Sequence, residues 1–115
     1  MLAMIKMHDY AHYAKEVEKL RMLLQKEASD DENIVLEFLI SSKDAVGEKL
    51  NSLEHSREYI HWVLSDDAQE IVLFANSLMK NHYSKDEEIN DLIFRCAKNL
   101  AYLISVKCAQ FYTED

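Results

Sequence analysis

The chain contains no proline and a single glycine, Gly47. Both residues are common in tight turns and poor inside helices, so a chain almost without them cannot build a turn-rich β fold. The sequence therefore predicts an all-α protein. The same scarcity excludes a glycine-rich phosphate loop, a nucleophile elbow and a zinc-finger knuckle.

Cysteine is also scarce, with Cys96 and Cys108 both on the expected last helix. At a rise of about 1.5 Å per residue they lie roughly 18 Å apart, which is too far for a disulfide. We expect reduced thiols and a cytoplasmic protein. No apolar run approaches the roughly 20 residues that span a membrane, and the N-terminal segment lacks the features of a signal peptide.

The charge balance is acidic, with 21 acidic and 13 basic residues and a net charge of −8 over 115 residues. This length predicts one domain, residues 1–115. The negative charge disfavours direct binding to nucleic acid, whose phosphates are bound mainly by lysine and arginine. It favours a basic protein partner.

Apolar spacing predicts the first two helical stretches. The first runs from near the N-terminus to Ala28, with one face formed by Tyr10, Tyr13, Val17, Leu20 and Leu24. Ser29, Asp30 and Asp31 then offer N-cap oxygens. The second stripe consists of Leu36, Leu39, Val46, Leu50, Leu53, Ile60 and Leu64. Its phase is continuous, so it allows one long helix, but we expect a break near Gly47 or around His55 and Ser56.

Two further helices follow. Ser65, Asp66 and Asp67 predict a helix start, and the apolar face of that helix consists of Ile71, Phe74, Ala75, Leu78 and Met79. Ser84 and Glu87 have the spacing of a capping box. They are expected to open the last helix, whose apolar face is Ile89, Leu92, Ile93, Cys96, Leu100, Leu103, Ile104 and Phe111. The predicted architecture is an antiparallel bundle of four or five helices with short connections.

Histidines give two candidate metal sites. His8, His12 and Glu16 are four residues apart, but they lie opposite the first apolar stripe and are expected to point outward. Glu58 and His61 match the Glu-x-x-His pattern of ferritin-like di-iron proteins, which need that pair twice, and the chain has it once. We interpret both as solvated surface and expect no metal or other cofactor.

Arg57 and His61, one helical turn apart, resemble the catalytic pair of the HEPN ribonucleases, which are all-helical. The spacing here is shorter than in that motif, and Glu58 stands where the motif has a different polar residue. The resemblance covers five residues and does not assign the family. A ribonuclease or a histidine-based metal protein is therefore an alternative to the binding function described next.

The aromatic pattern points to a binding surface. Tyr59 and Trp62 fall about 150° from the apolar stripe at the roughly 100° per residue of a helix. Either a fifth helix covers them, or they form an exposed patch with Asp66, Asp67 and Glu70 as an acidic rim. Tryptophan and tyrosine are frequent anchors in protein interfaces. We therefore predict a non-enzymatic binding module for a basic protein, resembling an inhibitor, immunity protein, antitoxin or chaperone in size and charge. A homodimeric structural subunit is a further alternative.

Overall fold

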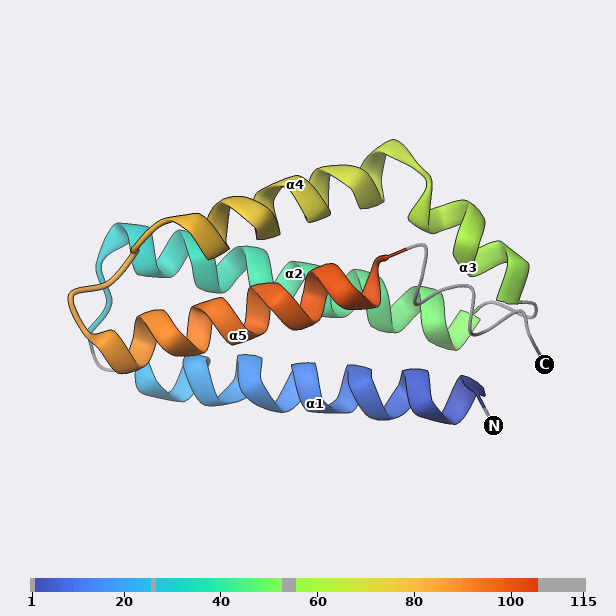
Figure 1. Cartoon of the computed structure of the whole chain (residues 1–115). Helices are drawn as coiled ribbons and strands as arrows, with labels where there is room; N and C mark the ends of the chain where they lie inside the picture. The colour runs from blue at the N-terminus through green and yellow to red at the C-terminus, as the bar shows by residue number, and fades with distance from the viewer. Residues whose placement is uncertain (1, 26, 53–55, 106–115) are drawn as a thin grey trace.

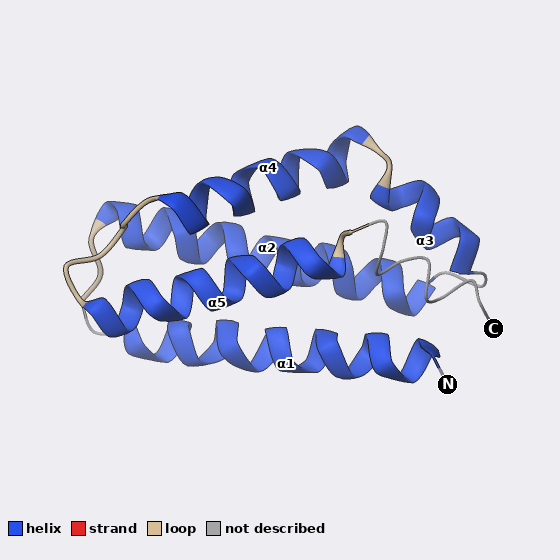
Figure 2. Ribbon diagram, in the orientation of Figure 1, coloured by secondary structure: helices blue, strands red, loops and turns tan. Residues whose placement is uncertain are grey.

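The structure is a computed structural model that describes residues 2–25, 27–52 and 56–105. Side chains are described within these ranges except at positions 2–8, 50–52, 56–58 and 60. The five helices are α1 (Leu2–Leu23), α2 (Asp30–Ser52), α3 (Ser56–Val63), α4 (Asp66–Lys80) and α5 (Glu87–Leu103). The described residues contain no strand, as Figure 2 shows. The all-α prediction is therefore confirmed.

Four long helices lie roughly along one axis, and α3 closes one end (Figure 1). Helix α5 is central, because it packs against α1, α2 and α4. Helix α1 also packs against α2, and α3 packs against both α2 and α4. Consecutive long helices run in opposite directions, so α2 and α5 point the same way. This is the predicted antiparallel bundle, with short connections between the described helices.

The core is built mainly on α5, since one side of this helix is almost entirely buried. Its buried residues are Leu92, Ile93, Cys96, Ala97, Leu100 and Leu103. Helix α1 contributes Tyr13, Val17 and Leu20 in the predicted phase, and α2 contributes Val35, Leu39 and Val46. The apolar faces predicted for the first and last helices are thus confirmed at their described positions.

Two tyrosines join α1 to α2. The hydroxyl of Tyr13 donates to the Leu39 carbonyl oxygen at 2.9 Å, and that of Tyr10 donates to the Lys43 carbonyl oxygen at 3.0 Å. The two carbonyls are one turn apart on α2, as the two tyrosines are on α1. Gly47 follows one turn later and is buried beneath the Tyr10 ring. The glycine does not break the helix, so a break near Gly47 is the wrong alternative.

Two helix boundaries differ from the sequence prediction. Helix α1 ends at Leu23 rather than at Ala28. The second stripe is divided between α2, which ends at Ser52, and α3, which begins at Ser56. The intervening residues, which include Leu53 and His55, lie outside the described part. The buried residues of α3 include Tyr59 and Val63, so this helix does not follow the continuous phase of the predicted stripe. Leu64, predicted on the apolar face, lies beyond the end of α3 and is 59% exposed.

Candidate functional site

The corner between α3 and α4 contains the residues that the sequence singled out. Ser65 is the N-cap of α4, and its Oγ accepts a hydrogen bond from the backbone N–H of Ala68 at 3.3 Å. The same hydroxyl donates to the Trp62 carbonyl oxygen. Gln69 Nε2 donates to the Val63 carbonyl oxygen at 2.8 Å. These bonds satisfy both helix ends, so the corner is held in one geometry.

Tyr59 is a core residue and not an exposed anchor. It is 2% exposed, and its hydroxyl donates to the Leu103 carbonyl oxygen at 2.8 Å. The prediction of an exposed Tyr59 is therefore wrong. The buried face of α3 includes Tyr59 and Val63. The sequence left open whether Tyr59 is covered or exposed, and in the structure it is covered.

Trp62 lies at the boundary between core and surface. It is partly buried against the core, and its ring centroid is 5.6 Å from that of Tyr59. Two residues later, Leu64 is exposed at the α3–α4 corner. Trp62 is thus fixed on one side by the core while part of its surface reaches solvent.

The outer face of α4 combines carboxylates with an exposed leucine. Asp66, Glu70 and Leu73 have the i, i+4, i+7 spacing of one helical face, and all three are exposed. Leu73 is 67% exposed. The opposite face of α4 is buried through Ala68, Ala75 and Leu78. We define the outer surface as Trp62, Leu64, Asp66, Glu70 and Leu73, of which Leu64 and Leu73 were not singled out as site residues.

A second apolar surface lies between α2 and α4, and sequence analysis missed it. The rings of Phe38 and Phe74 meet with their centroids 4.3 Å apart. Ile34, one turn before Phe38, is 56% exposed, and Phe74 is 38% exposed. Phe74 was predicted in the apolar core face, so its exposure is a correction. Asp67 precedes Phe74 by two turns on the same side of α4.

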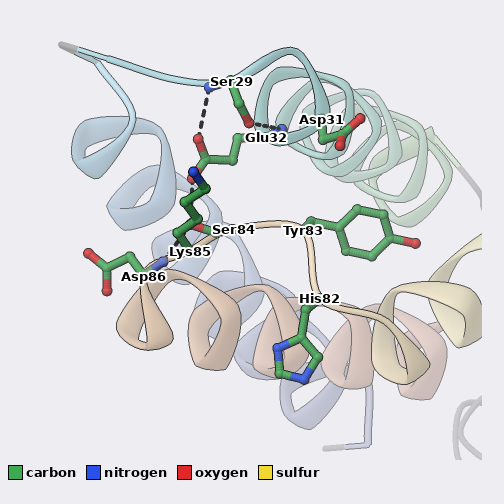
Figure 3. Close-up of a pocket in the computed structure, with 8 residues that line it drawn as sticks. All are labelled: Ser29, Asp31, Glu32, His82, Tyr83, Ser84, Lys85 and Asp86. Atoms are coloured by element: carbon green, nitrogen blue, oxygen red, sulfur yellow. Dashed lines mark hydrogen bonds between the residues drawn. The ribbon is translucent and has the colours of Figure 1, made fainter.

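The loops at the far end of the bundle form a pocket of about 600 Å³ (Figure 3). The capping box opens α2: the Ser29 backbone N–H donates to Glu32 Oε1 at 2.8 Å, and Glu32 N–H donates to Ser29 Oγ at 3.2 Å. Ser84 Oγ donates to the other Glu32 oxygen at 2.5 Å. These bonds hold the pKa of Glu32 below its ordinary value, the Ser29 backbone N–H having the largest effect.

The predicted capping box at Ser84 and Glu87 is therefore wrong. Asp86 is the N-cap of α5, and its Oδ1 accepts from the Glu88 N–H at 2.9 Å. Asn90 Oδ1 instead accepts from the backbone N–H groups of Tyr83 and Ser84. His82 and Tyr83 point away from the hydrogen-bonded Glu32 (Figure 3). The pocket's central carboxylate is occupied in joining two loops, which is a structural role.

The histidine candidates are dispersed in the described structure. His12 Nε2 lies 3.7 Å from Glu16 Oε1, and Arg95 Nε lies 3.4 Å from the same oxygen. Glu16 is thus largely covered between α1 and α5, and the prediction that it points outward is wrong. His61 is exposed, whereas the side chains of His8, Arg57 and Glu58 lie outside the described residues. Within the described part, no three His, Cys, Asp or Glu side chains are grouped to hold a metal ion.

The thiol of Cys96 is buried and unreactive in this setting. Burial, followed by the nearby charge of Glu16, raises the pKa of the Cys96 thiol to about 12. A thiol in that state is a packing group rather than a nucleophile. Cys108 lies outside the described residues. Within the described ranges, no helix is both long and apolar enough to cross a membrane.

Comparisons with protein-family models, with curated proteins and with solved structures each gave no match.

Proposed function

We propose that this protein is a small, non-enzymatic binding module that engages a basic protein in the cytoplasm. The observation that carries the proposal is the outer surface, where Leu64 and Leu73 are exposed beside Asp66 and Glu70. Burying an exposed leucine side chain against a partner lowers the free energy by about 25 cal/mol per Å² of apolar surface removed from water. Carboxylates beside them restrict the partners to proteins of positive charge.

The proposed mechanism has two steps, electrostatic steering of the partner and then burial of apolar side chains. The negative field of Asp66, Asp67 and Glu70 accelerates encounter with a basic partner, because attraction acts over about 10 Å at 0.1 M salt. Contact then buries Leu64, Leu73 and the exposed part of Trp62. The corner is held by the hydrogen bonds of Ser65 and Gln69, so little conformational entropy is lost on binding.

The proposal is tested with two charge-matched variants. The first, Asp66→Asn with Glu70→Gln, neutralises the carboxylates of the outer surface. The second, Glu87→Gln with Glu88→Gln, makes the same change in net charge at the start of α5. Each protein is immobilised to capture partners from host extract, and the association rate of a captured protein is measured against salt.

We expect a basic partner whose association with the wild-type protein slows as salt rises. The α4 variant should associate at least about tenfold more slowly, while the α5 control stays near the wild-type rate. Equal rates for the two variants would contradict the proposal. A wild-type protein that is a stable dimer through the outer surface would support the structural homodimer instead.

A further inference from the structure

We propose that the side of the bundle between α2 and α4 binds an amphipathic helix whose apolar face is flanked by lysine or arginine. This inference goes beyond the proposed function, because it concerns a second surface apart from the outer surface. We define the α2–α4 surface as Ile34, Phe38, Asp67 and Phe74. It is separate from Leu73, which lies about 100° away from Phe74 around α4.

The arrangement of the helices leaves this side uncovered. Helix α2 packs against α1, α5 and α3, and α4 packs against α5 and α3. Within the described helices, α2 and α4 do not form a packed interface along their lengths, and the Phe38–Phe74 pair connects them. In Figure 1, α4 diverges from α2 toward its first residue, where α3 joins. Among the described residues, α2 and α4 therefore lie antiparallel with no further helix across this side (Figure 1).

The side chains on this surface are suited to an apolar helical face. Ile34 and Phe38 are one turn apart on α2, and Phe74 meets Phe38 from α4. Ile34 and Phe74 keep much of their surface in water. Residues spaced by three or four along a partner helix would pack against such a row. Helix α4 has 15 residues, so a partner helix of similar length, about 22 Å, would cover it.

Charge decides between a basic helix and a second copy of this chain. Helices α2 and α4 together carry nine acidic and three basic residues, a net −6 within the −8 of the whole chain. Two copies meeting through this surface would bring like charges together, which opposes association. A helix with lysines or arginines on both sides of its apolar face would meet opposite charge instead.

The test uses a designed peptide of about 16 residues, with leucines on one helical face, lysines on both sides and alanine elsewhere. Its affinity is measured by calorimetry for the wild-type protein and for Ile34→Ser and Phe74→Ser. Met22→Ser is the matched control, because Met22 is large, apolar and exposed but lies outside both surfaces. Leu73→Ser tests the outer surface instead. Urea unfolding of every variant confirms that it is folded.

We expect binding that weakens with salt and that falls at least about tenfold in Ile34→Ser and Phe74→Ser, with under twofold change in Met22→Ser. Amide shifts on peptide titration of the wild-type protein should concentrate in α2 and α4, which provides a readout free of any substitution. A peptide with glutamate in place of lysine should not bind.

Three results would overturn the inference. The first is the absence of peptide binding, and the second is binding that is lost in Leu73→Ser but kept in Ile34→Ser. The second result would leave the proposed function intact, because it would place the partner on the outer surface. The third is a wild-type dimer that Ile34→Ser converts to a monomer, since the surface would then hold a second copy. Failure of the proposed function itself would appear in the capture experiment, as equal rates for the two charge variants.

Discussion

The ring of Tyr10 occupies the space that a side chain on Gly47 would need. A Cβ at Gly47 would lie 2.9 Å from Tyr10 Cζ and would overlap the hydroxyl oxygen. Gly47 has no positive φ, so glycine is not needed there for an unusual backbone conformation. It is needed because the Tyr10 ring lies too close to leave room for a Cβ. The only glycine of the chain thus allows α1 and α2 to meet where Tyr10 reaches the Lys43 carbonyl.

This relationship predicts coupling between Gly47→Ala and Tyr10→Ala. Alanine gains about 0.5–1 kcal/mol over glycine inside a helix, but at position 47 it must displace Tyr10 and its hydrogen bond, worth about 1 kcal/mol. We expect Gly47→Ala to be about 1 kcal/mol more favourable in a Tyr10→Ala background than in the wild-type protein. Urea unfolding of the four proteins measures this. An equal effect in both backgrounds would show that the two residues do not compete for space.

Leu100→Ala should destabilise the bundle strongly. Leu100 is fully buried in the last turn of α5, and truncating such a leucine costs about 2–5 kcal/mol in the free energy of unfolding. Leu73→Ala is the matched control, because Leu73 is largely exposed and its loss should change stability by under about 0.5 kcal/mol. Similar urea midpoints for the two variants would contradict the assignment of the core to α5.

Stability should fall in acid partly through Glu32. Hydrogen bonds from the Ser29 backbone N–H and the Ser84 hydroxyl lower the pKa of its carboxyl in the folded protein. Its contribution is therefore present above the pKa of the unfolded chain and is lost as the pH falls through the lower folded value. Glu32→Gln, which can keep the capping geometry without the charge, should flatten this loss. Ser29→Ala should cost about 1 kcal/mol at neutral pH. Parallel stability curves for wild type and Glu32→Gln below pH 5 would refute the assignment.

Tyr59→Phe should affect stability and leave binding unchanged. The substitution removes the hydrogen bond to the buried Leu103 carbonyl at a cost of about 1 kcal/mol while keeping the ring. Trp62 provides the internal control, because its emission reports whether the neighbouring ring has moved. An unchanged emission maximum with a lower urea midpoint is expected. Loss of partner affinity without loss of stability would restore Tyr59 as an interface residue.

Local patterns predicted those elements whose signals act within one helix. The faces of α1 and α5 follow from regular apolar spacing, and Ser65 caps α4 as its sequence indicates. The buried face of α3 could not be read in the same way, because it depends on contacts with other helices, such as the hydrogen bond from Tyr59 to the Leu103 carbonyl. A continuous apolar phase predicts Leu64 in the core and Tyr59 at the surface. In the structure Leu64 is exposed and Tyr59 is buried.

The two candidate capping boxes could not be told apart from the local sequence. Ser29 with Glu32 and Ser84 with Glu87 have the same spacing, and either could open a helix. The difference is tertiary, since the Ser84 hydroxyl donates to Glu32 and Asn90 holds the backbone beside it. The α2–α4 surface was missed for a similar reason. The helical spacing of Phe74 suits a core, and only the packing of whole helices leaves it exposed.

The weak pairing of α2 with α4 also sets how the protein opens. Among the described helices, α4 packs mainly against α5 and α3, while α1, α2 and α5 all contact one another. The attachment of α4 therefore depends on its interface with α5, and native-state hydrogen exchange in α4 should report the opening of that interface. A ligand seated across α2 and α4 would then slow exchange throughout α4, including amides that it never touches.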